Sequence, residues 1–430
     1  MPESPRMTIP VNQLRVGLYV HLDLGWMDHP FPLSSFKISS AQQIETIKGL
    51  GLTAIQISPD RSDPEPNTLV APVAPIAAPT KPAPSLADQA RLEQAQARQA
   101  TLAAQRQAQQ LCERQCQESA KALRAVFDQV NTAPDKAGAT CASTVSAMLG
   151  QLAGHEESAL RLLAEGYGDR PTLHAMNVAV LSLLLGRAMG LDSDALHHLG
   201  MAALVHDIGK QELPDRVRYR DDSFTAAHYK LYQDHVTHSV AKAKQMGLPA
   251  PVLLTISQHH EMADGSGFPL GLKTDKWIPT ARILALINRY EGLCNPPNPL
   301  KALTPHEALS LIFATMKERF EHQALNAFIR MMGVYPPGSI VQLTDERYAM
   351  VMSVNASRPL KPRVLVVDPS VPSEEAIFLD LQQASGLGIQ RSLRAEQLPR
   401  QALSYLSPRQ RVYYYFERAV SVNSASEGSA

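Results

Sequence analysis

The sequence predicts a mainly α protein, with an all-helical domain between a small N-terminal α+β domain and a C-terminal extension that follows a β-hairpin and a further strand. Three observations support this fold class. Apolar residues recur at helical spacing through residues 137–335, between short breaks that contain Gly or Pro. Strand-like patterns return from residue 339. Eight prolines in residues 59–84 separate the helical part from the N-terminal module.

The N-terminal module, residues 8–58, mixes two periods. Residues 14–22 have strand character around a glycine, and residues 53–57 (TAIQI) alternate like a short strand. Between them, the isoleucines and leucine of residues 44–50 follow the spacing of one helix face. These patterns predict a small α+β domain.

Residues 59–84 are rich in Pro and Ala and predict an extended, semi-rigid linker. Residues 85–130 are rich in Ala, Gln and Arg, which favours a helix, but their apolar stripe is thin. Such a helix is either a solvated spacer or one half of a coiled coil that forms a homodimer.

The large domain is expected over residues 137–368, and its predicted strands are residues 339–343, 348–354 and 362–368. Residues 369–430 are interpreted as a C-terminal extension. Its polar last ten residues, SVNSASEGSA, favour disorder.

Composition excludes several classes of function. Lys and Arg total 41, as do Asp and Glu, so no net charge attracts nucleic acid. The sequence has no run of about 18 apolar residues that could span a membrane, and its N-terminus lacks the apolar core of a signal peptide. Four cysteines cannot form a disulfide framework, so we expect reduced thiols and a cytoplasmic location.

Histidines and acidic residues cluster within the predicted helical domain. They are His174, His206, Asp207, His235, His259, His260, Glu261 and Asp264. Imidazole and carboxylate together suit Fe, Mn, Zn or Ni. A carboxylate next to a ligating histidine, as in His206–Asp207, can bridge two ions, and paired ions are a common solution for phosphoester hydrolysis.

A lone histidine is more often a packed or surface residue than a metal ligand. This interpretation suits His197, His198, His228, His238 and His322, and taken alone it also suits His174. His206–Asp207 is a stronger candidate because it follows the apolar run MAALV, and a buried polar pair needs satisfied partners or a metal. Lys210 lies one turn beyond Asp207, where it could reach a phosphate.

The motif HDIGK at 206–210, His235 in HVTHSVAKAKQMG, and HHEMADGSGFPLG at 259–271 resemble the HD-GYP branch of the HD phosphohydrolases. The resemblance runs from about residue 140 to residue 368. It implies hydrolysis of the bacterial messenger cyclic di-GMP with two or three metal ions. Residues 8–58 resemble a small uncharacterised domain that often precedes HD-GYP modules.

The resemblance also implies roles for single residues. It implies a first ion held by His174, His206 and Asp207. It implies a second ion held by Asp207, His235, His259 and His260. Asp207 and Lys210 would be catalytic, with Lys210 contacting the scissile phosphate or the attacking hydroxide. The residues implied for the substrate loop are Asp264, Gly265, Gly267, Phe268 and Pro269.

Four departures from the family pattern bear on activity. Phe268 replaces the tyrosine of the motif, so the hydroxyl is lost. Asn288 stands where the family has an aspartate that completes the first site, so we expect this site to be depleted. Residues 294–300 (CNPPNPL) lack the family's arginine. Arg170 replaces an acid of the three-ion members, which disfavours a third ion.

The leading interpretation is therefore a cyclic di-GMP phosphodiesterase with two transition-metal ions, Fe or Mn. One alternative is a degenerate regulatory module that binds cyclic di-GMP or a diguanylate cyclase (GGDEF) partner. Another is an HD hydrolase acting on a different phosphorylated metabolite.

Overall fold

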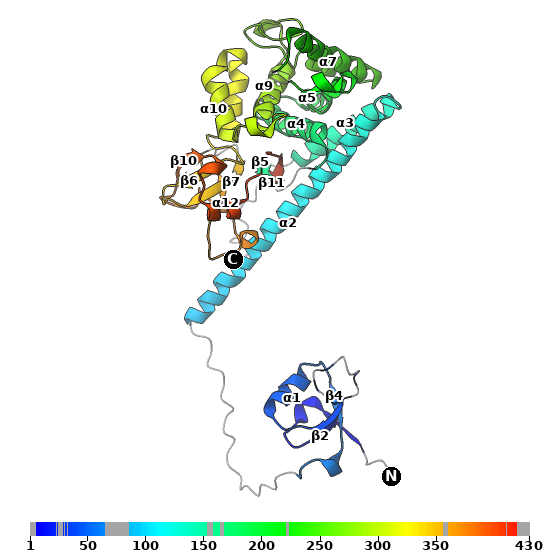
Figure 1. Cartoon of the computed structure of the whole chain (residues 1–430), viewed down its shortest axis with the longest axis vertical. Helices are drawn as coiled ribbons and strands as arrows, with labels where there is room; N and C mark the ends of the chain where they lie inside the picture. The colour runs from blue at the N-terminus through cyan, green and yellow to red at the C-terminus, as the bar shows by residue number, and fades with distance from the viewer. Residues whose placement is uncertain are drawn as a thin grey trace, which may run out of the picture. The chain divides into compact units, whose positions relative to one another are not determined.

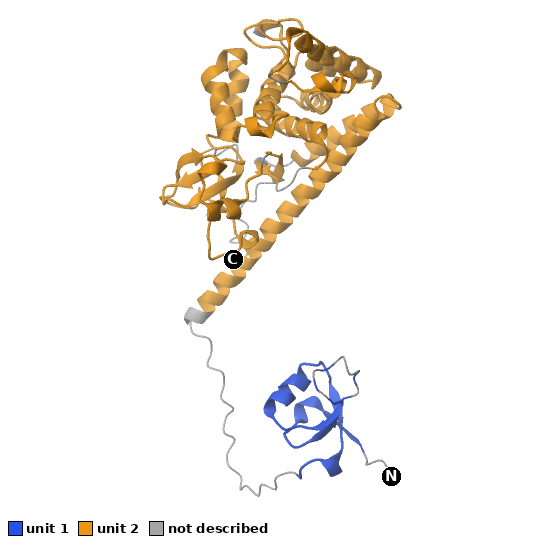
Figure 2. Cartoon of the chain, in the orientation of Figure 1, with its two compact units in different colours: residues 1–85 blue, residues 86–430 orange. Residues whose placement is uncertain are grey.

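The computed structural model describes residues 6–22, 24, 29, 31, 33–64, 86–152, 158–163, 167–220, 223–355, 360–409 and 411–418. The chain divides into two compact units, residues 1–85 and 86–430 (Figure 2). Most of the predicted linker and all of the predicted disordered end lie outside the described residues.

The first unit is a four-stranded antiparallel sheet in the order β1-β4-β2-β3, with one α-helix. Its elements are β1 (Met7–Pro10), β2 (Tyr19–His21), β3 (Ser35–Lys37), α1 (Ala41–Lys48) and β4 (Ala54–Ile57). Ser40 caps α1 by accepting a hydrogen bond from the Gln43 backbone N–H. Ile47 of α1 packs in the core with the strand residues Val20 and Ile55. The predicted small α+β domain is confirmed.

The first unit extends further than the sequence predicted. Residues 59–61 form a 3₁₀ turn, and the Asp63 backbone N–H donates to Gly17 O at 2.9 Å. The Arg61 guanidinium lies 3.9 Å from the centre of the Tyr19 ring. The placement of a linker start at residue 59 was therefore wrong, because polar contacts hold residues 59–63 on the sheet.

The second unit is mainly helical (Figure 1). Its helices are α2 (Leu86–Gln129), α3 (Pro134–Leu152), α4 (Arg170–Ala188), α5 (Ser193–Val205), α6 (Asp215–Arg218), α7 (Ala226–Gln245), α8 (Ala250–Ser257), α9 (Pro279–Cys294), α10 (Pro305–Thr315), α11 (His322–Met332) and α12 (Arg400–Leu406). Helix α4 is buried along most of its length and contacts α5, α9 and α11. The predicted helical domain is confirmed.

Helix α2 differs along its length. Residues 89–101 are exposed, as expected of a solvated spacer, but from Cys112 onward one face belongs to the main core. Leu123 and Val126 are fully buried there. A solvated spacer throughout was therefore wrong, because the second half of the helix packs on α3, α4 and β11 (Figure 1).

A seven-stranded antiparallel sheet completes the second unit. Its strands are β5 (Ser158–Leu162), β6 (Ile340–Leu343), β7 (Tyr348–Asn355), β8 (Arg363–Val366), β9 (Leu379–Asp380), β10 (Ile389–Leu393) and β11 (Tyr414–Arg418). The order β10-β6-β7-β5-β11 is branched by β8, which pairs with β7 and β9. The predicted hairpin is β6 and β7, whereas β5 lies in a stretch that was interpreted as helical and was missed.

The pairing of β5 with β11 joins the two ends of the second unit. Tyr415 lies opposite Arg161 in the register. Arg161 and Glu417 form an ion pair, and the two side chains are 2% and 4% exposed. Arg363 adds a contact to Glu417 at 3.7 Å. Removing one partner of such a pair leaves a buried charge, which is strongly destabilising, so the C-terminal strand is an integral part of the unit.

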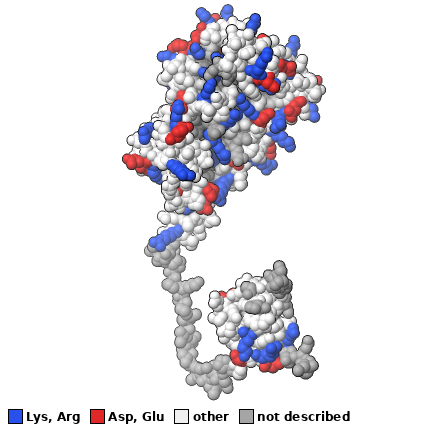
Figure 3. Space-filling view, in the orientation of Figure 1, with Lys and Arg blue, Asp and Glu red and all other residues white. Residues whose placement is uncertain are grey.

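Acidic and basic side chains are interspersed on the face of the second unit seen in Figure 3, in keeping with the zero net charge. Within the described part of the chain, no helix is both long and apolar enough to cross a membrane.

Candidate metal centre

Four helices bring the predicted histidines together. His174 lies in α4, near an N-terminus that the Asp169 side chain caps. His206 and Asp207 follow the last residue of α5, and His235 lies within α7. His259 and His260 follow α8.

Three of the imidazoles are oriented in the same way. His206 Nδ1 lies 2.9 Å from Ala203 O, His235 Nδ1 lies 2.5 Å from Tyr232 O, and His259 Nδ1 lies 2.6 Å from Ile256 O. A carbonyl oxygen can only accept, so each Nδ1 carries the proton and each Nε2 is left as a lone-pair donor. The local turn, three residues back along the chain, therefore sets the tautomer that a metal requires.

Asp207 lies between two groups of imidazoles. Its Oδ2 is 3.4 Å from Nε2 of both His174 and His206. Its Oδ1 is 3.4 Å from His235 Nε2 and 3.7 Å from His259 Nε2. One carboxylate oxygen faces each group, which suits a carboxylate shared by two ions.

Two sets of residues could each hold an ion, because the ligand atoms within each set all lie within 4.8 Å of one another. One set is Asp207, His235, His259 and His260, and the other is His174, His206 and Asp207. In the set expected for the second ion, Asp207 Oδ1 and the three Nε2 atoms are buried and have no hydrogen-bond partner. Leaving so many buried polar atoms unpaired is costly, and a divalent cation would satisfy them together. The residues therefore fit the metal that the sequence implies.

Burial keeps most of these imidazoles neutral. Desolvation lowers the pKa of His235 to about 3. Desolvation also lowers the pKa of His206 and holds that of His260 well below its usual range. Neutral imidazole is the form that binds a metal. At His174, burial lowers the pKa, but the carboxylates of Glu291 and Asp207 outweigh it and raise the pKa to about 9.

Lys210 lies beside the shared carboxylate. Its Nζ is 2.5 Å from Asp207 Oδ2 and 5.4 Å from the centre of the Tyr232 ring. Burial lowers the pKa of Lys210, but the Asp207 carboxylate raises it by more, so the pKa lies above its usual value. Lys210 is therefore a fixed positive charge at the edge of the centre.

The loop after His260 is built on Glu261 and does not add a ligand. Glu261 is fully buried, and its two carboxylate oxygens accept the Leu270 and Leu272 backbone N–H groups, both at 2.7 Å. A Cβ on Gly267 would lie 2.4 Å from Met262 N, so only glycine fits there. Phe268 stacks on His260 with ring centres 4.5 Å apart, which shows that the ring packing does not need the lost hydroxyl.

Asp264 also lies outside both ligand sets. Its side chain accepts from the Ser266 backbone N–H at 2.9 Å and lies 3.9 Å from the Arg319 guanidinium. The sequence grouped Glu261 and Asp264 with the candidate metal ligands, but the structure places neither acid in a ligand set. Both acids shape the loop that carries Gly265 and Pro269.

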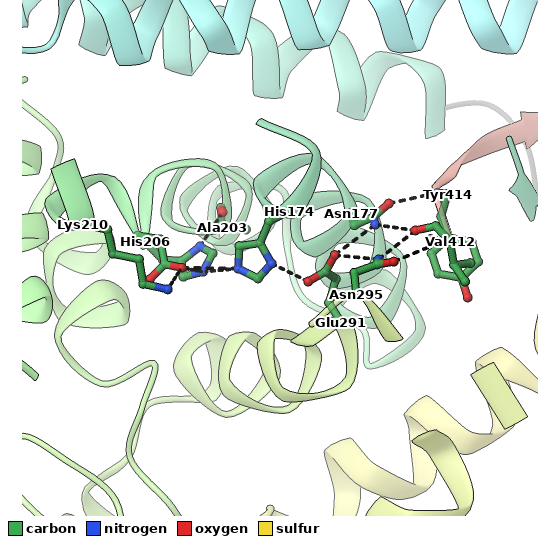
Figure 4. Close-up of polar contacts among 10 residues, drawn as sticks. His174, Asn177, Ala203, His206, Lys210, Glu291, Asn295, Val412 and Tyr414 are labelled. Atoms are coloured by element: carbon green, nitrogen blue, oxygen red, sulfur yellow. Dashed lines mark hydrogen bonds and ion pairs between the residues drawn. The ribbon is translucent and has the colours of Figure 1, made fainter. Parts of the chain in front are cut away.

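Three residues missed by sequence reasoning support His174 (Figure 4). Glu291 Oε2 forms a short hydrogen bond with His174 Nδ1. Asn177 and Asn295 donate to Glu291 Oε1 at 3.2 and 2.8 Å. Glu291 stands three residues after Asn288, on the same face of α9. This three-residue spacing within NRYEGL is the sequence signal that could have identified Glu291.

A cavity of about 870 Å³ opens over the centre. Its lining includes His174, Asp207, Lys210, His259, His260, Gly267 and Phe268. Asn288 and the proline-rich residues 296–297 line it too, so the departures noted in the sequence face the same space. Arg170 also faces it, with its guanidinium 4.3 Å from the centre of the Tyr219 ring.

Residues 152–323 match the model of the HD domain family. This chain contains an HD domain. Residues 6–140 match a second family, described as a domain of unknown function, DUF3391. The resemblance stated from the sequence is confirmed, and the HD model spans His174, Asp207, His235 and His260.

Several known proteins resemble this chain. A cyclic di-GMP phosphodiesterase of Pseudomonas aeruginosa is 26% identical over 365 residues, covering 83% of this chain and 84% of that protein. A 3′3′-cGAMP-specific phosphodiesterase of Vibrio cholerae is 25% identical over 174 residues, covering 40% of each. A solved HDG"Y"P protein from Bdellovibrio bacteriovorus is 16% identical, with a TM-score of 0.39, covering 75% of this chain and 98% of that one.

The histidines interpreted as packing or surface residues lie outside both ligand sets within the described residues. His197 Nε2, for example, lies 3.0 Å from Ser146 Oγ. His322 is exposed and lies 4.0 Å from Glu318.

Proposed function

We propose that this protein is a metal-dependent phosphodiesterase that hydrolyses cyclic di-GMP. The observation that carries the proposal is the convergence of four unpartnered buried atoms, Asp207 Oδ1 and Nε2 of His235, His259 and His260. The names of the relatives from P. aeruginosa and V. cholerae support a cyclic dinucleotide as the substrate class.

The two ligand sets support a centre of two divalent transition-metal ions, Fe or Mn, that share Asp207. Such ions would activate water and neutralise phosphate oxygens when bound. The protein contributes the orientation of the imidazoles, and Lys210 lines the cavity as a positive charge for a phosphate oxygen. Gly267 and Phe268 of the loop line the same cavity.

The cavity also offers positive charge for a second phosphate. Arg289, partly buried on α9 beside Asn288, lines it together with Arg220 and Arg319. None of the ion pairs among the described residues involves Arg289. The centre of the Tyr229 ring lies 5.1 Å from the Arg220 guanidinium, and the ring forms an edge contact with Phe268. Guanidinium and aromatic groups together suit the phosphates and bases of a dinucleotide.

The decisive experiment uses the full chain, purified without oxygen and loaded with Fe or Mn. Metal content is measured by elemental analysis, and products from cyclic di-GMP and 3′3′-cGAMP are separated by chromatography. Hydrolysis of cyclic di-GMP supports the proposal, and faster hydrolysis of 3′3′-cGAMP would reassign the substrate. Binding without hydrolysis would replace the enzyme by a regulatory module. Protein that takes up neither metal would contradict the ligand assignment.

Exchange of Asn288 for Asp is expected to raise both metal affinity and hydrolysis, since a carboxylate would add negative charge at the first site. A tenfold gain in turnover requires only about 1.4 kcal/mol of transition-state stabilisation. Metal titration and initial rates check this. Asn298→Asp, which puts the same charge on an exposed residue of the cavity rim, is the matched control and should not raise metal content. Equal behaviour of the two variants would show that Asn288 does not face the first site.

Exchange of Arg289 for Gln is expected to weaken cyclic di-GMP binding roughly 10- to 100-fold, because a hydrogen bond to a charged group contributes about 1.5–3 kcal/mol. KM should rise while kcat changes little, since a guanidinium offers no lone pair to a metal and Arg289 would act in substrate binding. Calorimetric titration and steady-state kinetics measure the two quantities. Arg330→Gln, an exposed residue of α11, controls for loss of one positive charge. An equal effect of both substitutions would contradict a role for Arg289 in binding.

Partners and location are also proposals. Two exposed leucines of α2, Leu92 and Leu111, support a homodimer through residues 85–130, which sedimentation would measure. A diguanylate cyclase partner rests on the family resemblance alone. Four free, buried cysteines support a cytoplasmic location.

A further inference from the structure

The C-terminal strand reaches the metal centre through two asparagines. Asn177 Nδ2 donates to Val412 O at 2.9 Å, and Asn177 Oδ1 accepts from the Tyr414 backbone N–H at 2.9 Å. Asn295 Nδ2 donates to Val412 O at 2.9 Å, and Asn295 Oδ1 accepts from the Val412 backbone N–H at 2.8 Å. Both amides thus bind the backbone of the residues that lead into β11.

The same two amides hold Glu291. Each donates to Glu291 Oε1, and the other oxygen, Oε2, binds His174 Nδ1. Figure 4 shows these groups in one line from Val412 and Tyr414 through Glu291 to His174. Glu291 is 3% exposed, so its charge depends on these donors for stabilisation. A carboxylate on Nδ1 fixes the ring and leaves His174 Nε2 directed at His206 and Asp207.

We propose that residues 412–414, which lead into β11, are part of the metal centre: through Asn177, Asn295 and Glu291 they position His174 for its ion. The proposal rests on the metal binding in the proposed function and does not depend on the substrate. Asn177, Asn295 and Glu291 are positioning residues, because they act through His174.

Strand β11 also contacts helix α2. Ser119 Oγ lies 2.9 Å from Tyr415 Oη, and Cys112 Sγ lies 3.3 Å from Phe416 O. The strand therefore lies between α2, the helix that begins the second unit, and the residues that hold His174.

The test is a double-mutant cycle on metal affinity. Metal-free full-length protein is titrated with Mn²⁺, and the free ion is measured by electron paramagnetic resonance. The variants are Asn295→Ala, His174→Ala and their combination, with Asn177→Ala as an independent second disruption of the same contacts. Asn326→Ala, an exposed position on α11, is the control for the substitution itself. Thermal unfolding in chelator is recorded for every variant.

Loss of a group that orients a metal ligand weakens metal binding roughly 10- to 100-fold, so Asn295→Ala should raise one Mn²⁺ dissociation constant by that factor. In the His174→Ala background the same change should have an effect below about twofold, because the residue it positions is gone. The Nδ1–H resonance of His174, identified by its loss in His174→Ala, should shift in Asn295→Ala.

Additive effects in the cycle, or an affinity unchanged in Asn295→Ala and Asn177→Ala, would overturn the proposal. An unchanged affinity in His174→Ala would also overturn it, because His174 would then hold no ion. Hydrolysis by the parent protein is read separately. A protein that binds Mn²⁺ with the expected cycle but cleaves no cyclic dinucleotide would contradict the phosphodiesterase and leave the positioning role intact.

Discussion

Exchange of Asp207 for Asn is expected to remove metal from both sites and to lower hydrolysis of cyclic di-GMP at least a thousandfold. Asp207 belongs to both ligand sets, with one oxygen facing each. Loss of its charge weakens both ions at once, and a thousandfold loss corresponds to about 4 kcal/mol of transition-state stabilisation. Elemental analysis and initial rates measure the two effects.

Single-histidine variants make this expectation selective. His174→Ala should remove one ion, and His260→Ala the other, because each belongs to one set only. His197→Ala is the control, since its partner is Ser146 and it lies outside both sets. If Asp207 were only a polar contact of the core, Asp207→Asn would lower the unfolding temperature and leave metal content unchanged. Calorimetry beside metal analysis separates these two results.

Exchange of Gly209 for Ala is expected to destabilise the second unit by about 3 kcal/mol, at the upper end of the usual cost of overpacking. A Cβ on Gly209 would lie 2.3 Å from both His235 O and Ser239 N, and these are backbone atoms of α7 that cannot turn aside. Gly209 also donates its backbone N–H to Ser239 Oγ at 2.9 Å. Helix α7 would have to move, and His235 would move away from Asp207 with it.

Urea unfolding followed by circular dichroism measures the stability change, and Mn²⁺ titration measures the accompanying loss of affinity. Gly150→Ala is the matched control. Gly150 is an exposed residue of α3 where an added Cβ would meet no atom within 4 Å, so alanine should stabilise the helix by about 0.5–1 kcal/mol. Equal stability of the parent and Gly209→Ala would show that η3 (Ile208–Glu212) and α7 are not in the close contact described.

The fold class could be predicted because its signals are local. Helical spacing of apolar residues continues for many turns in α4, α5 and α9, and such periods depend on neighbouring residues alone. Strand β5 was missed because five residues between helices are too few to reveal an alternating pattern. Its partner β11 is also more than 250 residues away in sequence. The burial of α2 from Cys112 onward was missed for a similar reason, since a thin apolar stripe reveals no partner.

The sequence by itself determined which residues are available to hold metal. The His-Asp pair, the paired histidines after α8 and the Gly267 loop are contiguous motifs, so their chemistry can be recognised without a structure. The tertiary structure decided which acids serve that chemistry. Glu261 and Asp264 adjoin the histidines in sequence but bind the loop, whereas Glu291 is 117 residues from His174 and contacts it directly. Asn177 and Asn295 hold Glu291 and also bind the backbone of residues 412–414, and such contacts exist only after distant segments have packed together.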